Sequence, residues 1–121
     1  MKTLILKLDA TGDVVRTTTL LRRLRGDVNW ITAGRNLPLL SGIVENLRAC
    51  EWGDRERFKD EQYDLLINLE DDLEVAKFAR QVSAARIYGA YTACGEVVSY
   101  TSDSRGWFDL SLISAFGRER A

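Results

Sequence analysis

The stretch KLDATGDVVRTTTLLRRL, residues 7–24, follows directly on the apolar run LIL, residues 4–6. In its second half, apolar residues recur at steps of three and four, which is the pattern of an amphipathic helix. The passage from an apolar run to such a helix is typical of the first β-α unit of a parallel sheet. Asp9, Gly12 and Asp13 occupy the turn between the two. Ligands of parallel α/β sheets bind outside the carboxyl ends of the strands, so this turn is the first candidate site.

The rest of the chain alternates in the same way between β-rich apolar runs and helical patterns. Strands are expected over residues 3–8, 28–33, 43–50, 63–69 and 86–91, and a further strand over 96–101 is expected to return on 86–91 as a hairpin. Helices are expected over residues 13–25, 70–85 and 107–116. This order predicts an α/β, Rossmann-like fold with a mostly parallel sheet and helices on both faces. The length of 121 residues suits a single domain over residues 1–121.

Composition excludes several classes of function. The chain has no histidine, so imidazole acid–base chemistry and histidine metal sites are absent, and its net charge of −1 gives no general attraction to nucleic acid. Cys50 and Cys94 lie far apart and in no metal-ligand spacing, which favours two thiols in a reducing cytosol over a disulfide. No apolar run approaches the roughly 20 residues of a membrane helix, so a soluble protein is expected.

The first turn lacks the known phosphate-binding signatures. It has a single glycine, hence no G-x-G-x-x-G, and no G-K-[ST] follows. Its aspartates would also repel a pyrophosphate. The turn therefore suits hydroxyl groups, a cation or proton abstraction. Two roles stay open for Asp13: the N-cap of the following helix, since aspartate is a preferred capping residue, or a general base.

A second acidic group, Glu70-Asp71-Asp72, follows the strand expected over residues 63–69. If that strand lies beside the first, both acidic groups face one crevice. Asp71 with Glu74 three residues later has the spacing of a capping box. The functional alternatives are hydrogen bonds to sugar hydroxyls, or a divalent cation shared with Asp9. Lys7, at the end of the first strand, is placed to pair with Asp9.

Three segments in this order resemble glycosyltransferase family 9, the ADP-heptose:lipopolysaccharide heptosyltransferases. They are LILKLDATGDVVRTTTLLRRLR (4–25), YDLLINLEDDLEVAKFAR with ARIYGAY (63–80 and 85–91), and SDSRGWFDLSLIS (102–114). The first contains the Gly-Asp-Val motif that opens a threonine-rich helix in that family. The similarity covers about residues 3–116.

The resemblance implies the amino-terminal, acceptor-binding half of a GT-B enzyme. It implies that Asp13 is the base that deprotonates the acceptor hydroxyl, with inversion at the sugar and with no metal or other cofactor. The nucleotide-sugar donor, such as ADP-heptose, would bind through a carboxy-terminal half that is absent from this chain, so that the chain alone transfers no sugar. The expected acceptor is a lipopolysaccharide-type saccharide, and the expected location is cytoplasmic, with peripheral association at the inner face of the membrane left open.

Around Asp13, five residues are expected to bind the acceptor: Lys7, Asp9, Gly12, Asp71 and Asp72. A surface left uncovered by the missing half is expected to form a homodimer. Two other functions remain as alternatives. One is a receiver-like signalling domain that binds a divalent cation with Asp9, Asp13 and residues 70–72; the other is a non-catalytic Rossmann-like scaffold.

Overall fold

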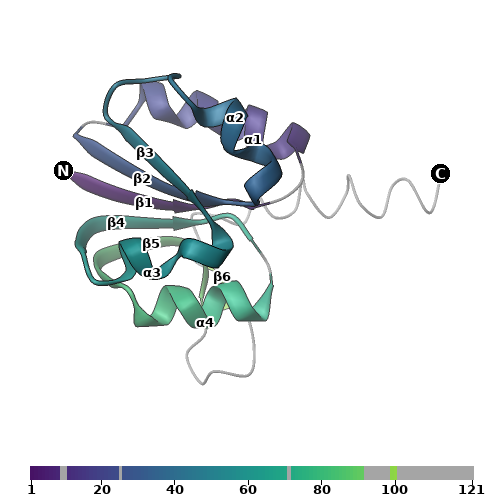
Figure 1. The fold of residues 1–121 in the computed structure, drawn as a ribbon. Coiled ribbons are helices and arrows are strands. Elements are labelled where there is room, and N and C mark those ends of the chain that lie inside the picture. Colours follow the sequence, from purple (N-terminus) through teal and green to yellow (C-terminus); the bar gives the residue numbers. More distant parts are fainter. Residues whose placement is uncertain (9–10, 25, 71, 92–98, 101–121) are drawn as a thin grey trace.

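The computed structural model describes residues 1–8, 11–24, 26–70, 72–91 and 99–100. Within them a six-stranded sheet has the order β3-β2-β1-β4-β5-β6 (Figure 1). The strands are β1 Lys2–Leu6, β2 Asp27–Thr32, β3 Leu47–Glu51, β4 Gln62–Asn68, β5 Ser83–Tyr91 and β6 Ser99–Tyr100. β1 to β5 pair in parallel and β6 pairs antiparallel with β5. The predicted mostly parallel sheet is therefore confirmed, as is the antiparallel return strand.

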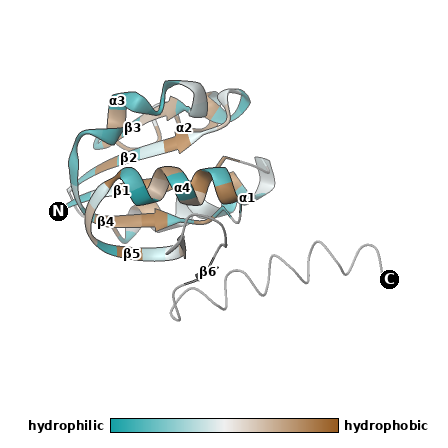
Figure 2. Cartoon of the chain, turned by 90° about the horizontal axis from the view of Figure 1, so that it is seen from below, coloured by the Kyte–Doolittle hydropathy of each residue, from teal (hydrophilic) through white to brown (hydrophobic). Residues whose placement is uncertain are grey.

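Helices cover both faces of this sheet, as Figures 1 and 2 show. α1 (Thr11–Thr17) and α2 (Leu37–Leu40) lie on one face, and α3 (Glu56–Lys59) and α4 (Leu73–Gln81) lie on the other. Alternate residues of β1 point to the two faces: Ile5 packs with Val14 of α1, and Leu6 packs with Phe78 of α4. A strand covered in this way must be apolar throughout, which is why its sequence is a continuous apolar run.

β1 lies at the centre, between β2 and β4. Leu4, Ile5 and Leu6 have no exposed surface. In register, Leu6 lies opposite Ile31 of β2 and Asn68 of β4. Because parallel strands end at the same edge, the residues that follow β1, β2 and β4 are brought together there. The condition for the two acidic groups to share one edge of the sheet is therefore met.

The first helix differs from its prediction. It begins at Thr11 rather than at residue 13, and it stops being α-helical at Thr17, after which η1 (Thr18–Arg22) is a 3₁₀ helix. The hydroxyls of Thr17, Thr18 and Thr19 each donate to a backbone carbonyl three or four residues earlier. Consecutive β-branched residues with hydroxyls that compete for backbone carbonyls disfavour a continued α-helix.

Other boundaries shift as well. The helix expected over residues 70–85 is α4, Leu73–Gln81, and residues 83–85 belong to β5. The strand expected over residues 43–50 is shorter and lies at Leu47–Glu51. The segments that connect the elements contain η2 (Gly34–Asn36) and η3 (Trp52–Asp54) in addition to α2 and α3. The helix expected over residues 107–116 lies outside the described residues.

Cys50 of β3 is a buried free thiol. Burial raises the pKa of Cys50 to about 11, against the opposing charge of Arg57. The thiol is therefore protonated at neutral pH and is a poor nucleophile. Cys94 lies outside the described residues.

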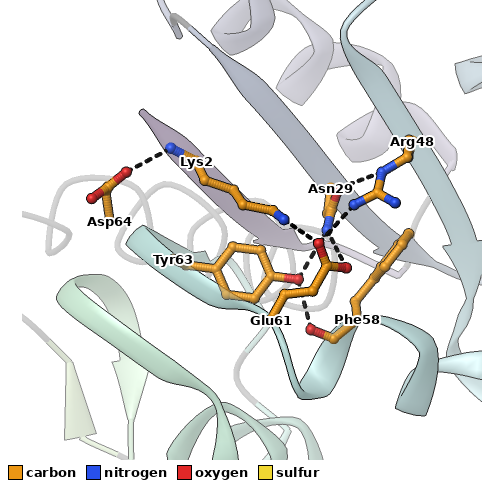
Figure 3. A network of polar contacts seen from close by, with 7 residues as sticks. All are labelled: Lys2, Asn29, Arg48, Phe58, Glu61, Tyr63 and Asp64. Carbon is orange, nitrogen blue, oxygen red and sulfur yellow. Dashed lines mark hydrogen bonds and ion pairs between the residues drawn. The ribbon is translucent and has the colours of Figure 1, made fainter.

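A polar network joins four strands near their amino ends (Figure 3). The Glu61 carboxylate accepts hydrogen bonds from Lys2 Nζ, from Arg48 Nη2 at 2.8 Å and from Asn29 Nδ2 at 3.2 Å. Burial by itself would raise the pKa of Glu61, but the bonds and positive charges of Lys2 and Arg48 outweigh it and lower the pKa. The network therefore favours the charged carboxylate.

The same network extends to the side chain of Tyr63 on β4. Its hydroxyl accepts from Asn29 Nδ2 at 2.9 Å and donates to the Phe58 carbonyl at 2.6 Å. Burial raises the pKa of Tyr63 to about 12, although the bond from Asn29 opposes this. Tyr63 thus stays a neutral donor and connects β4 to α3.

Replacing Glu61 by glutamine tests this network. A glutamate whose pKa is lowered by folding stabilises the folded state above its unfolded pKa of about 4.3, and this stabilisation is lost as the pH falls through the lower folded value. We expect Glu61→Gln to lower the free energy of unfolding by about 2 kcal/mol at pH 7, with the deficit shrinking toward pH 3. Urea unfolding at both pH values measures this.

Exposed Glu45 supplies the control, since Glu45→Gln should change stability little at either pH. A deficit for Glu61→Gln that is the same at pH 3 and pH 7 would contradict the assigned charge network.

Candidate functional site

Asp13 and Gly12 lie at the start of α1, above the carboxyl edge of the sheet. The Asp13 side chain is 39% exposed, and its Oδ1 lies 3.2 Å from Arg16 Nη2. Gly12 is exposed, and a Cβ placed on it would have no atom within 4 Å. Space therefore opens beside Gly12, and the Asp13 carboxylate is accessible to solvent.

Because α1 begins at Thr11, Asp13 is the third residue of the helix and not its N-cap. The capping role that the sequence left open for Asp13 is therefore wrong. An acidic residue in the first turn still interacts favourably with the helix dipole, by a few tenths of a kcal/mol at an exposed position. The alternative of a general base stays open.

Below this turn, Lys7 forms a buried ion pair with Glu70. Lys7 Nζ lies 3.2 Å from Glu70 Oε1, and the two side chains are only 7% and 14% exposed. The same Oε1 accepts a hydrogen bond of 2.6 Å from the Leu8 backbone N–H. The sequence placed Lys7 beside Asp9; its partner among the described residues is Glu70, and Asp9 lies outside them.

The Leu8 carbonyl is held from the opposite side. It accepts from Asn36 Nδ2 at 2.7 Å, and from Thr32 Oγ1 and the Ala33 N–H at 3.3 Å each. Asn36 Oδ1 in turn accepts from Thr11 Oγ1 at 2.9 Å, and Asn36 itself is fully buried. Both backbone groups of Leu8 are therefore fixed before the chain enters residues 9–10.

Two further buried side chains support this edge. The Trp30 indole donates to the Lys7 carbonyl at 3.0 Å. Asn68 accepts from the Glu70 N–H and donates to the Ala90 carbonyl, both at 3.0 Å, which connects the end of β4 to β5. None of Trp30, Asn36 and Asn68 was predicted from the sequence as part of this site. The available signal was a polar or amphipathic residue at or just after each strand end, which by itself does not indicate a partner.

Asp72 is the N-cap of α4. Its Oδ1 accepts from the Glu74 N–H at 2.7 Å. The cap therefore lies one residue later than the expected capping box of Asp71 and Glu74; Asp71 itself lies outside the described residues. A preferred capping residue in this place explains why α4 begins at Leu73.

An open pocket of about 310 Å³ lies beside Leu8, which follows β1. Its lining consists of an aromatic ring, three carboxylates and two aliphatic side chains: Trp52, Glu70, Asp72, Glu74, Leu8 and Val75. Trp52 makes an edge contact with Phe78 at 5.4 Å between ring centroids, and the Arg55 guanidinium lies 4.2 Å from the Trp52 centroid. Trp52 is thus half-buried in the core on the α4 face.

Among the described residues, no group of three or more cysteine, aspartate and glutamate side chains is placed to hold a metal ion. In the same part of the chain, no helix has the length and apolar character needed to cross a membrane.

Comparison with solved structures finds the E. coli heptosyltransferase WaaC with ADP. The match covers 74% of this chain and 36% of that one, with a TM-score of 0.56 and 19% sequence identity. The chain thus spans about a third of the length of that protein. No protein-family model matches the sequence, and no curated protein matches it. At this identity the likeness shows a shared fold: the Rossmann-like α/β architecture of one part of a glycosyltransferase.

Removing Glu70 tests whether the buried pair fixes the edge of the sheet. Glu70→Ala leaves the Lys7 ammonium buried without its ion-pair partner and removes the acceptor of the Leu8 N–H. We expect the free energy of unfolding to fall by about 3–5 kcal/mol, measured by urea denaturation at pH 7.

A double-mutant cycle with Lys7→Met separates charge from packing. Adding Lys7→Met to Glu70→Ala should recover part of the loss, because the buried charge is then gone. If the loss of unfolding free energy in the double variant equals the sum of the losses in the two single variants, Lys7 and Glu70 are not coupled.

Proposed function

We propose that the chain is the acceptor-binding half of an inverting GT-B glycosyltransferase of the family 9 type. It would serve transfer of a sugar from a nucleotide-sugar such as ADP-heptose to a lipopolysaccharide-type acceptor. The observation that carries this proposal is the accessible Asp13 carboxylate beside the open space at Gly12. The shared fold with a heptosyltransferase supports it.

In the proposed reaction, Asp13 takes the proton of an acceptor hydroxyl. The acceptor oxygen forms a bond to the anomeric carbon of the donor sugar, and the bond from that carbon to the diphosphate oxygen breaks on the opposite face. The diphosphate leaves with the bonding electrons, so the configuration at the sugar is inverted. General-base catalysis of this kind contributes about 10²–10⁴ in rate.

The acceptor would lie along the carboxyl edge of the sheet. Gly12 allows its close approach, and Asp72 is exposed at the pocket beside Leu8 and would receive hydroxyl hydrogen bonds there. Lys7 is buried, so its contribution is to hold Glu70 and Leu8 in place. Asp9 and Asp71 complete the proposed acceptor set; both lie outside the described residues.

The donor nucleotide-sugar is assigned to a second half that lies outside residues 1–121. A homodimer of this domain and a cytoplasmic location remain predictions. The receiver-like alternative requires a divalent cation among Asp9, Asp13 and residues 70–72, and no observation in the described residues favours it over the transferase.

Asp13→Asn tests the proposed base in the full-length enzyme that joins this domain to its donor half. Asparagine keeps the size of the side chain but accepts no proton, so we expect kcat to fall by about 100-fold or more. Stability should change by less than about 1 kcal/mol, because the pair with Arg16 is exposed. Release of ADP from ADP-heptose in the presence of a core saccharide measures kcat.

Asp60→Asn, at an exposed position after α3, is the matched control and should leave kcat unchanged. The isolated 121-residue chain is the second control and is expected to transfer no sugar. Wild-type turnover by Asp13→Asn, or sugar transfer by the isolated chain, would refute the respective part of the proposal.

A further inference from the structure

Asn36 lies at a helix start but does not cap the helix. It is the last residue of η2 and the N-cap of α2, yet its side chain makes no capping hydrogen bond. Asparagine is among the preferred residues at this position because its side-chain oxygen accepts a backbone N–H of the first turn. The Asn36 backbone is helical here (φ −95°, ψ −7°), and Pro38 in the first turn of α2 has no N–H to donate. The amide is instead directed toward Leu8 and Thr11.

The amide of Asn36 bridges the two ends of the segment that leads to Asp13. Its Nδ2 donates to the carbonyl of Leu8, and its Oδ1 accepts from the hydroxyl of Thr11, three residues further along the chain. The orientation of the amide is determined by these partners, because a carbonyl only accepts and must face the NH₂ group. Asn36 itself has no exposed surface, although its partner Thr11 is exposed.

Thr11 is also the first residue of α1, and Asp13 belongs to the same helical turn. Fixing Thr11 at one end, while Val14 and Thr17 are buried at the other, fixes the direction in which this turn presents Asp13. A general base must lie within hydrogen-bond reach of the proton it takes, and a displacement of about 1 Å can cost about 100-fold in rate.

We propose that Asn36 is a positioning residue that holds Thr11, and through it the Asp13 carboxylate, in the geometry for proton abstraction. This inference rests on the function proposed above. It adds a residue 23 positions further along the chain, on another element, to the machinery of that reaction.

The test measures kcat and KM in the full-length enzyme, with the amount of folded protein determined for each variant. Asn36→Asp keeps the shape but sets a carboxylate oxygen against the Leu8 carbonyl, and Thr11→Val removes the hydroxyl donor at an exposed position. We expect kcat to fall about tenfold or more for both variants, with KM changed by less than about threefold. Thr11→Ser, which keeps the hydroxyl, should restore most of the wild-type kcat.

Two matched controls lie away from Asn36 and its partners. Asn46→Ala removes an amide that bonds the Gly26 carbonyl, and Thr19→Val removes a hydroxyl that bonds the Arg16 carbonyl. Both should leave kcat unchanged. In the isolated chain, exchange of the hydrogen-bonded Leu8 amide should quicken by about tenfold in Thr11→Val but not in Thr19→Val. This readout keeps the proposal testable if Asn36→Asp does not fold.

A double variant separates this proposal from the one on which it rests. If Asn36 acts through Asp13, Thr11→Val should lower kcat no further in an Asp13→Asn background. Wild-type kcat in Thr11→Val, together with a large loss in Asp13→Asn, would overturn the role of Asn36 alone. Wild-type kcat in Asp13→Asn would overturn the proposed base itself.

Discussion

The backbone of the chain is still buried directly after the central strand β1, at Lys7 and Leu8, and the residues around this edge of the sheet are arranged to satisfy it. A buried peptide group without a partner is costly, so each one at this edge must find a donor or an acceptor. The indole of Trp30 meets the Lys7 carbonyl, the Glu70 carboxylate meets the Leu8 N–H, and the Asn36 amide meets the Leu8 carbonyl. Side chains from three separate segments of the chain therefore fix the backbone of Lys7 and Leu8. The position of Asp13 is a consequence of how β1 ends.

In this arrangement, buried residues support the site from below, and accessible residues form its surface. Lys7, Glu70 and Asn36 are largely or fully buried, whereas Gly12 is exposed and the Asp13 side chain is partly exposed. A catalytic side chain works best when buried neighbours hold it and its reactive atoms remain open to substrate. The fold shared with a heptosyltransferase covers about a third of that protein.

The sheet could be predicted from the sequence because parallel strands that are buried on both faces consist of continuous apolar runs. The run at residues 4–6 is the clearest of them. The sequence predicted less well where side chains decide the outcome. The threonines at 17–19 ended α1 early through their hydroxyls, and Asp72 took the capping position expected of Asp71. Asn36 and Glu70 were missed as partners of Leu8 because their bonds span 28 and 62 residues. No local pattern encodes such contacts.

The central claim is that the carboxyl edge of β1 receives a sugar hydroxyl at Asp13. Titration of the isolated, ¹⁵N-labelled chain with a deacylated lipopolysaccharide core saccharide, followed by amide chemical shifts, tests it most directly. The account predicts saturable shifts that concentrate at Gly12 and Asp13 and at the pocket around Asp72. Saturable shifts confined to another face of the domain, or none at all at millimolar saccharide, would contradict it.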